Sequence, residues 1–429
     1  MVVQKIKKLH TKTFYSLKIR NYRLYFIGQA VSLSGTWMQT VAQGWLVLQL
    51  TGSGTQLGAV VALQFVPMLF LGPWGGLVTD RYNKRTILYS TQVAFGLLTL
   101  GIGLLILVGA IHIWMLYVFA LLFGFVRIFD NPARQTFVAE LVEAAHMKNA
   151  VSLNATENNL ARAVGPSVAG VLIAGVGIAF CFLFNALSFV ASIITLFLMR
   201  KEELYVPPAY QKKQGELRAG FRYVWHSPLI RNTLLLIAVI GMFAFEFQVS
   251  LPLLAQETFG AGAGGYAALL SAMGLGAVVG GLFAAGRHTI APHHLVVFVL
   301  LFGLSMVATS LMPTLPWAVV GMLVVGFFSI NVTSLGNTML QLESAVHMRG
   351  RVMALWGVAM IGSTPIGGPI VGFVGEYLGG RFGIGLGGAA TVLAGAVAAF
   401  VLLKQDTVHR VSAAVEAQRD ESASKNIQL

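Results

Sequence analysis

Long apolar runs alternate with short polar interruptions along most of the chain. Twelve of the runs reach about 20 residues, the length that a helix needs to cross a bilayer. The interruptions carry Gly, Pro and charge clusters, which end or bend helices. The sequence predicts twelve transmembrane helices, at residues 22–50, 55–79, 86–109, 112–131, 151–175, 178–199, 232–258, 264–286, 293–312, 315–340, 351–377 and 382–403. The first, fifth, seventh and eleventh are long and contain Gly, so we expect tilt or kinks in them.

The predicted helices divide into two sets of six. The sets lie at residues 22–199 and 232–403, with a linker at 200–231 and tails at 1–21 and 404–429. A faint repeat supports the division, because Ser16–Asn21 and Ser227–Asn232 agree at four of six positions just before each set. Parallel six-helix halves are an established transporter plan. We therefore predict an all-α polytopic membrane protein with two pseudo-symmetric six-helix bundles.

The linker contains a segment with an apolar face and a basic face. Its apolar residues recur at helical spacing and are Leu217, Phe221, Val224 and Trp225. Arg218 and Arg222 fall on another face of the same helix. This pattern favours a helix that lies in the inner membrane interface. The alternative is a linker helix in solution.

The composition excludes a water-soluble protein. Only 10% of the residues are charged and 56% are hydrophobic, whereas a soluble domain has about 25% charged residues. The net charge of +13 would suggest nucleic-acid binding in a soluble protein. In a membrane protein it is expected, because Lys and Arg collect in cytoplasmic loops. We therefore expect no nucleic-acid partner.

The basic residues also predict the orientation. With the N-terminus in the cytoplasm, Arg381 is the only one of the 29 Lys and Arg residues in a predicted outer loop. An even number of spans returns the C-terminus to the same side. We therefore expect both termini in the cytoplasm, as the excess of positive charge on inner loops requires.

A charged turn follows the second predicted helix. Its motif residues are Gly76, Asp80, Arg81, Lys84 and Arg85. An acid at the inner end of a helix, beside a basic turn, can latch neighbouring helices by charge pairing. The turn resembles the conserved loop between helices two and three of the major facilitator superfamily. Asn83 stands where that family has Gly, and Asn tolerates the left-handed backbone. The alternative is a basic loop that only sets the topology.

The fifth predicted helix carries a second motif. Gly165, Pro166 and Gly170, with Ala161 and Ala169 in place of two glycines, are similar to the antiporter motif of the same superfamily. Pro166 frees a backbone carbonyl and permits bending. The resemblance implies a pliable, closely packed helix between the two halves. Ordinary packing through small residues is the alternative.

A narrower resemblance covers residues 15–403. The segments Asn131–Gln135, Arg162–Pro166 and Phe184–Phe189 resemble the branch that contains the enterobactin exporter and related drug efflux proteins. The resemblance implies a monomeric secondary transporter in the bacterial cytoplasmic membrane. It would export small amphiphilic, drug- or siderophore-like molecules by alternating access, driven by proton antiport, without a cofactor.

Among the ionisable side chains of the predicted spans, three are the first candidates for function. Such groups are costly in a bilayer and are functional by default. Glu246 is the deepest and lies between aromatic residues. Since desolvation disfavours its charged form, we expect it to carry protons or bind a cationic substrate, the alternative being a structural ion pair. Glu157 and Arg162 lie in the inner part of helix five and pair with each other or across helices. Arg162 is a gate residue or a structural latch.

Two further charges lie near the inner end of the fourth predicted helix. Arg127 and Asp130 are three residues apart, a spacing at which a helical ion pair forms. The alternative is an inner-gate network that includes Asp80 and stabilises the outward-open state.

Polar amides in the spans supply a possible lining for a central cavity. They are Gln39, Gln43, Gln64, Asn185, Gln248, Asn331 and Asn337. For each amide alone, a hydrogen bond between helices is the simpler interpretation.

Other classes of function find little support in the sequence. We find no zincin, Walker or cysteine-cluster motif, and we expect no metal, no cofactor and no catalytic residue. Importers and lipid transporters of the same fold remain alternatives. A membrane-embedded enzyme or signalling protein is the alternative from another class.

Overall fold

The computed structural model describes residues 14–205, 216–287 and 291–401, except the side chains of Pro73, Leu77, Asp80 and residues 216–219. Its elements are helices throughout the described residues. The predicted tails therefore lie largely outside the description, as does residue range 206–215 of the predicted linker.

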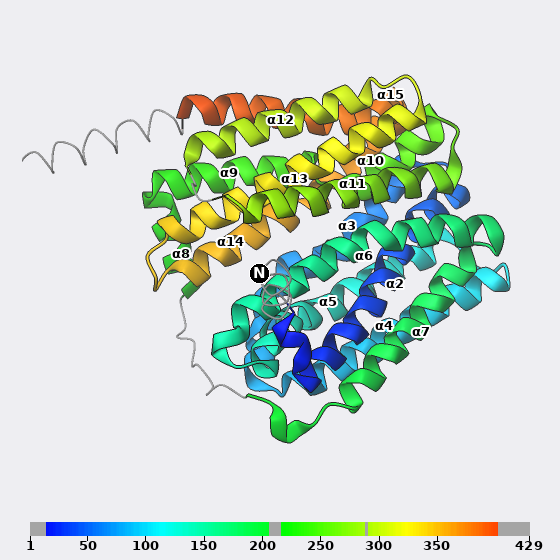
Figure 1. Ribbon diagram of the computed structural model, residues 1–429. Coiled ribbons are helices and arrows are strands. Elements are labelled where there is room, and N and C mark those ends of the chain that lie inside the picture. Colours follow the sequence, from blue (N-terminus) through cyan, green and yellow to red (C-terminus); the bar gives the residue numbers. More distant parts are fainter. Residues whose placement is uncertain (1–13, 206–215, 288–290, 402–429) are drawn as a thin grey trace, which may run out of the picture.

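The first set of helices forms one bundle, drawn in blue to green in the lower part of Figure 1. It consists of α2 (Arg20–Thr51), α3 (Gly54–Arg81), α4 (Lys84–Leu107), α5 (Ile113–Leu141), α6 (Met147–Gly175) and α7 (Ile178–Phe197). Short 3₁₀ turns lie at Tyr15–Lys18, Ala144–His146 and Lys201–Glu203.

The second set forms the upper bundle of Figure 1. It consists of α9 (Pro228–Phe243), α10 (Phe247–Leu253), a π-helical turn at Leu254–Thr258, α11 (Gly262–Ala285), α12 (Pro292–Ser310), α13 (Leu315–Glu343), α14 (Arg349–Ile361) and α15 (Thr364–Leu378). A last helix covers Gly380–Val401. The linker helix α8 (Glu216–His226) packs beside α9 and α14.

The number of spans agrees with the sequence. Ten helical stretches among the described residues are long and apolar enough to cross a membrane. α2 and α6 fall below that threshold because they carry more polar residues, but their 32 and 29 residues are sufficient for a span. With these two, the arrangement is consistent with twelve.

Two of the four helices for which we expected kinks are broken outright. The seventh span divides between α9 and α10, and the eleventh divides between α14 and α15. The first and fifth spans, α2 and α6, stay continuous, although α6 holds Pro166.

The fourth helix is longer than predicted. It was expected to end at residue 131, but α5 continues to Leu141 with Pro132 inside it. The extension has an apolar face that includes Ala133, Phe137 and Leu141, all fully buried in a cluster with residues of α2, α4, α6 and α7. Burial of that face compensates for the hydrogen bond that proline removes from a helix.

The linker helix α8 is amphipathic as predicted. Val224 is buried in a small cluster with Ile230 and Val352, whereas Phe221 and Trp225 are more than half exposed. The two exposed rings stack on each other with centroids 6.3 Å apart. Exposed aromatic rings on a basic helix suit a membrane interface.

The two bundles contact each other mainly through two helix pairs, α3 with α15 and α6 with α11. Both contacts lie toward the end of the molecule opposite the linker, which we call the far end. The α2–α3 turn at residues 52–53 and the end of α15 lie there. Other contacts between the bundles come from α10 and α11 against α2 and α3.

Glycine permits the close helix approach within the first bundle. A Cβ atom added to Gly75 of α3 would collide with the carbonyl oxygen of Ile128 on α5. A Cβ atom on the neighbouring Gly76, the glycine of the sequence motif, would meet nothing within 4 Å. The residue that allows the α3–α5 contact is therefore Gly75, and Gly76 faces open space.

This pair supplies a matched test of helix packing. Gly75→Ala should destabilise the protein by roughly 1–3 kcal/mol, the usual cost of overpacking. Gly76→Ala should leave stability equal or slightly raised, because Ala favours helix over Gly by about 1 kcal/mol. Thermal unfolding in detergent measures both. Equal melting temperatures for the two variants would contradict the packing assigned to Gly75.

Candidate functional site

Glu246 lies at the break in the seventh span. It is the N-cap residue of α10, and its backbone carbonyl accepts hydrogen bonds from the amides of Val249 and Ser250 at 3.0 and 2.9 Å. Its side chain is only 2% exposed. The sequence placed Glu246 in the middle of a continuous helix, but the structure places it between two helix segments.

The break in the eleventh span lies beside the break in the seventh. A Cβ atom on Gly241 of α9 would come within 2.8 Å of the Met360 carbonyl oxygen and 3.0 Å of Ser363 Oγ. Gly367 of α15 likewise touches the backbone of Met242. Two discontinuous helices therefore meet at one depth, with Glu246 between them.

Residues of two further helices, α15 and α3, lie beside the Glu246 carboxyl. The side chain of Thr364, at the start of α15, hydrogen-bonds with it. A Cβ atom on Gly368 would lie 3.6 Å from Oε2, and 3.1 Å from the carbonyl oxygen of Gly58 on α3. Oε1 has no hydrogen-bond partner among the described residues. Glu246 is therefore a buried acid, partly satisfied, at the contact between the two bundles.

Glu157 is the second buried acid. It is 4% exposed on α6, and neither carboxyl oxygen has a hydrogen-bond partner among the described residues. Arg134 of α5 and Tyr22 and Tyr25 of α2 lie close enough to interact with the Glu157 side chain electrostatically. Burial of a carboxyl group without hydrogen-bond partners is costly for the folded protein.

Arg162 does not pair with Glu157. Its guanidinium lies over the ring of Trp37 on α2, 4.8 Å from the centroid. The two charges are five residues apart on α6, which places them on different faces of the helix. Of the two predicted alternatives, mutual pairing is not found among the described residues, and Arg162 makes a cation–π contact with α2 instead.

The glycines of the helix-five motif lie at contacts with two different helices. A Cβ atom on Gly165 would come within 2.6 Å of the Ser34 carbonyl oxygen on α2. A Cβ atom on Gly170 would lie 2.9 Å from Ala267 Cβ on α11, in the other bundle. Pro166 is buried between them. The motif therefore packs α6 against both α2 and α11.

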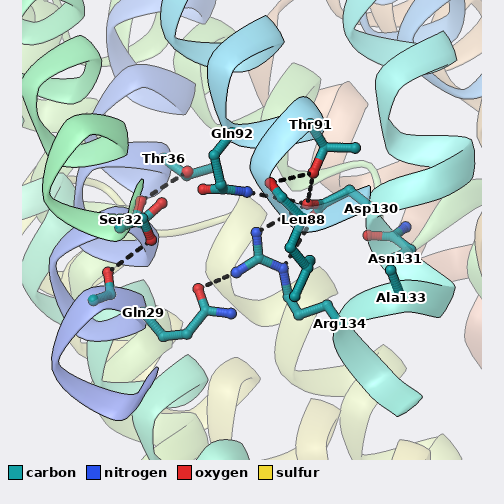
Figure 2. Close-up of polar contacts among 12 residues, drawn as sticks. Gln29, Ser32, Thr36, Leu88, Thr91, Gln92, Asp130, Asn131, Ala133 and Arg134 are labelled. Atoms are coloured by element: carbon teal, nitrogen blue, oxygen red, sulfur yellow. Dashed lines mark hydrogen bonds and ion pairs between the residues drawn. The ribbon is translucent and has the colours of Figure 1, made fainter. Parts of the chain in front are cut away.

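A polar network fills the linker end of the first bundle (Figure 2). Asp130 accepts hydrogen bonds from Thr91 Oγ1 at 2.7 Å and from Gln92 Nε2 at 3.1 Å, both on α4. Its other partner is Arg134, whose Nε lies 3.0 Å from Oδ2. Arg134 also donates to Gln29 of α2. The network therefore ties α2, α4 and α5 together.

The predicted ion pair between Arg127 and Asp130 is wrong. In the described residues Asp130 pairs with Arg134, four residues later, because α5 continues past Pro132 and brings Arg134 onto the same face. Arg127 instead lies over the ring of Phe65, 5.7 Å from its centroid. A network that includes Asp80 stays a prediction, since the Asp80 side chain lies outside the description.

The basic residues of the charged turn contact different partners. Lys84 forms an ion pair of 2.5 Å with the buried Glu140 of α5. Arg85 donates to the carbonyl oxygens of Leu196 and Met199, at 2.5 and 3.1 Å, and so caps the end of α7. Arg81 is exposed. Lys84 and Arg85 therefore connect α4 to α5 and α7 within the first bundle.

Asn83 does not adopt the left-handed backbone that we expected. Its φ of −61° and ψ of 119° are extended. Its side chain accepts a hydrogen bond from the Thr86 amide at 3.3 Å, as the N-cap of α4. Asn is a preferred N-cap residue, which explains its place in the turn without a strained backbone.

Some of the predicted cavity amides bind other helices. Gln39 Oε1 accepts from Thr99 Oγ1 at 3.1 Å and from Asn185 Nδ2 at 2.5 Å, which joins α2, α4 and α7. Asn331 accepts from Arg287 at 3.1 Å and donates to the Gly280 carbonyl, which joins α13 to α11. These three amides stabilise the bundles.

For the other four amides the structure gives burial or local contacts and no side-chain hydrogen bond to another helix among the described residues. Gln43 and Gln64 are buried in the first bundle. Gln248 is half-buried in α10, with its backbone carbonyl near Gly44 of α2. Asn337 accepts from Gln341 one turn along α13 at 2.6 Å. A shared cavity lining by these amides stays a prediction.

Sequence reasoning gave no role to several residues that the structure places in polar contacts. Arg134 and Glu140 lie beyond the predicted end of the fourth helix. Arg134 pairs with Asp130 and Glu140 pairs with Lys84 because α5 extends past that end. Thr364 gave no signal because a lone Thr is common in spans. Glu376 was not singled out, because it lies near the predicted end of a helix, where acids are ordinary.

This fold is that of a membrane transporter with two helical bundles. The family model described as "Transmembrane secretion effector" matches residues 11–424. The chain therefore belongs to this family of the major facilitator superfamily, as the sequence motifs indicated. Proteins of this superfamily are transporters, and the predicted absence of enzyme activity agrees with that membership.

Known relatives and structures agree with the assignment. The chain is similar to the multidrug efflux pump Tap of Mycolicibacterium fortuitum, at 25% identity over 78% of this chain and 84% of the relative. It is also similar to the enterobactin exporter EntS of Escherichia coli O1:K1, at 26% identity over 83% and 86%. These relatives support a multi-pass bacterial membrane protein.

Two solved structures share the fold. One is a bacterial homologue of the human lysosomal transporter Spinster, in an inward-facing and unoccupied conformation, with a TM-score of 0.66, 15% identity, and coverage of 92% of this chain and 98% of that one. The other is a variant of the nucleoside transporter NupG, with a TM-score of 0.67, 15% identity, and coverage of 90% and 99%. At this identity the likeness concerns the fold alone.

The pairing of Asp130 can be tested with double-mutant cycles. Asp130→Asn should destabilise the protein by roughly 3–5 kcal/mol, because it removes the ion-pair partner of Arg134, whose side chain is only 21% exposed. Arg127→Gln should cost about 1 kcal/mol or less, the value of an ordinary cation–π contact.

The coupling energy between two mutations reports whether the residues interact. We expect strong coupling of Asp130→Asn with Arg134→Gln and clearly weaker coupling with Arg127→Gln, which makes no ion pair with Asp130 among the described residues, both measured by thermal or denaturant unfolding. Strong coupling to Arg127 in place of Arg134 would show that the pair predicted from the sequence is the real one.

Proposed function

We propose that the protein exports small amphiphilic, drug- or siderophore-like molecules from the bacterial cytoplasm by alternating access, in exchange for protons. The observation that carries the proposal is the position of Glu246, a buried acid where two broken helices meet at the contact between the bundles. Broken helices with free backbone groups at mid-depth are a recurrent way to build transporter sites.

Glu246 is our proposed proton carrier. A carboxyl buried beside apolar rings is more easily held neutral than charged, and Thr364 gives it a single side-chain hydrogen bond. When the bundles separate at α3 and α15, the same carboxyl gains access to water and can release its proton. The Glu246 carboxyl would then exchange its proton with the side of the membrane to which the transporter is open.

Arg162 and Glu157 are secondary candidates. Arg162 is stacked on Trp37, and the backbone of residues 162–163 touches Gly274 of the other bundle. A half-buried guanidinium at this contact suits an anionic substrate group or a gate. The Glu157 carboxyl lacks hydrogen-bond partners among the described residues. It is our candidate for a second proton-binding site.

The distribution of basic residues supports the proposed orientation of the protein in the membrane. If the linker end faces the cytoplasm, as the positive-inside rule predicts, the bundle contacts lie on the outer side and the state is inward-facing. Export is supported by the names of two relatives, an efflux pump and an exporter. We propose a monomer in the cytoplasmic membrane, surrounded by lipid.

Replacement of Glu246 tests the proton coupling. Glu246→Gln keeps the shape of the side chain and its hydrogen bond with Thr364 but cannot exchange a proton. We expect it to abolish uptake of fluorescent amphiphiles driven by a pH gradient in inverted vesicles, a loss of at least tenfold, with wild-type expression and melting temperature. Glu257→Gln is the matched control, because Glu257 is an exposed acid on the same span.

The outcomes separate the alternatives. Full gradient-driven transport by Glu246→Gln would refute the role of Glu246, and loss in Glu157→Gln alone would transfer that role to Glu157. Accumulation in right-side-out vesicles, but not in inverted ones, would indicate an importer. Movement of labelled phospholipid in place of the amphiphiles would indicate a lipid transporter.

A further inference from the structure

A carboxylate of the second bundle binds the first turn of a helix in the first bundle. Glu376, near the end of α15, accepts a hydrogen bond from Ser53 Oγ at 2.8 Å through its Oε2 atom. The same oxygen accepts a second bond from the backbone amide of Thr55, also at 2.8 Å. Both donors belong to the α2–α3 turn and the start of α3, at the far end of the molecule.

The contact completes the N-cap of α3. Ser53 is the N-cap residue, and its Oγ accepts from the Gln56 amide at 3.2 Å while it donates to Glu376. The first amides of a helix have no partner within the helix, and Thr55 supplies one of them. A negative charge is stabilised at a helix N-terminus. Glu376 therefore gives α3 a charged cap that comes from the opposite bundle.

This cap lies at one end of a continuous contact between α3 and α15. Residues 364, 368, 372 and 376 of α15 recur every four positions and so share one face of the helix. Gly368 and Gly372 on that face contact the backbones of Gly58 and Gly54 on α3. Thr364 at the other end binds Glu246. We call this row of contacts the α3–α15 seam.

The seam covers Glu246 from the far end. Gly58 and Gly368 meet next to its Oε2 atom, and Gly54 and Gly372 meet one turn further out. The Glu376 contact is the outermost of the row. Separation of the bundles at this end requires that its two hydrogen bonds break, whereas the glycine contacts offer only van der Waals attraction.

We propose that Glu376 is a clasp that holds the far end of the transporter closed through the N-terminus of α3. The clasp sets the balance between the state described here and a state that is open at the far end. It thereby sets how readily Glu246 is exposed on that side. This last consequence rests on the proposed role of Glu246, whereas the clasp itself does not.

A nearby acid provides the matched control. Glu257 lies close enough to Glu376 to interact with its charge, but it hydrogen-bonds to the backbone of Gly380 in its own bundle. Glu257→Gln therefore removes one negative charge from the same rim and leaves the contact between the bundles intact. If the effect depended only on negative charge at the far end, it would appear both in Glu257→Gln and in the Glu376 variants.

Spin-label distances measure the clasp without substrate or a proton gradient. Labels at Val108 and Leu311, which are 73% and 71% exposed, report the far end. Labels at Tyr82 and Val346, which are 66% and 83% exposed, report the linker end. Cys181, the single native cysteine, is replaced by Ala in the proteins that carry either label pair.

We expect Glu376→Ala to raise the ratio of far-end-open to far-end-closed molecules by roughly tenfold, which corresponds to about 1.4 kcal/mol. Longer distances should appear at the far end and shorter ones at the linker end. Ser53→Ala should shift the ratio in the same direction. Glu376→Gln should shift it less than Glu376→Ala, because its amide oxygen still accepts. Glu257→Gln should match the wild type.

Unchanged distances in Glu376→Ala, with a wild-type melting temperature and monodisperse elution, would overturn the proposal. An equal shift in Glu257→Gln would also overturn it, since it would assign the effect to rim charge. Loss of gradient-driven transport in Glu246→Gln is independent of these readouts. Failure of the clasp and failure of the proposed proton site are thus distinguishable.

Discussion

Direct backbone contact between small residues of the two bundles is the constraint on which the structure depends. In a membrane the lipid chains are as apolar as Leu, so burial of apolar side chains gives helices little reason to associate. Close approach restores an attraction, because backbones within van der Waals distance gain dispersion energy along their length. Gly54 and Gly58 against Gly372 and Gly368 provide this on one side. On the other side Gly274 lies against the backbone of Ala163, and Ser167 and Ser271 share a hydrogen bond of 2.8 Å. Among the described residues neither contact holds an ion pair, and the charge at the α3–α15 contact is the Glu376 carboxylate, whose two hydrogen bonds to the start of α3 break when the bundles separate.

The charges inside each bundle are arranged differently, although the bundles are related by pseudo-symmetry. In the first bundle Asp130 of α5 binds Arg134, with amide and hydroxyl partners from α4. In the second bundle α13 offers Asn331, which accepts a hydrogen bond from Arg287, two residues beyond the end of α11. An amide cannot neutralise a guanidinium, and Arg287 instead lies over the rings of Phe283 and Phe298. The first bundle is therefore fixed by a charged network, whereas the second depends on softer cation–π contacts and has broken helices. This difference suits a machine in which one half deforms more than the other.

Periodicity and composition were sufficient for the architecture, because span length and charge asymmetry follow from the bilayer itself. The breaks in the seventh and eleventh spans were also partly visible, as long runs that contain Gly. The partners of individual charges were not predictable. Arg127 and Arg134 are both within one turn of Asp130, and only the continuation of α5 past Pro132 selects Arg134. The choice between Gly75 and Gly76 depends on the rotation of α3 about its axis, which sequence does not define. Glu376 belongs to no motif, and its significance comes from a helix N-terminus more than 300 positions earlier in the chain.

The position of Glu246 connects these features. A continuous helix would direct its carboxyl to one fixed surface and would satisfy every backbone group around it. The breaks at α9–α10 and α14–α15 lie side by side, so the acid faces the end of one segment and the start of another, and in the described part of the chain only Thr364 binds its side chain. The α3–α15 seam then closes over it with two glycine contacts and, at the rim, Glu376 on the N-terminus of α3. A partly satisfied acid beneath a seam of weak contacts changes its surroundings when that seam opens, whereas the same acid within the Asp130 network would not. In the proposed mechanism, proton exchange and bundle separation are therefore coupled through one helix face, the face of α15 that runs from Thr364 to Glu376.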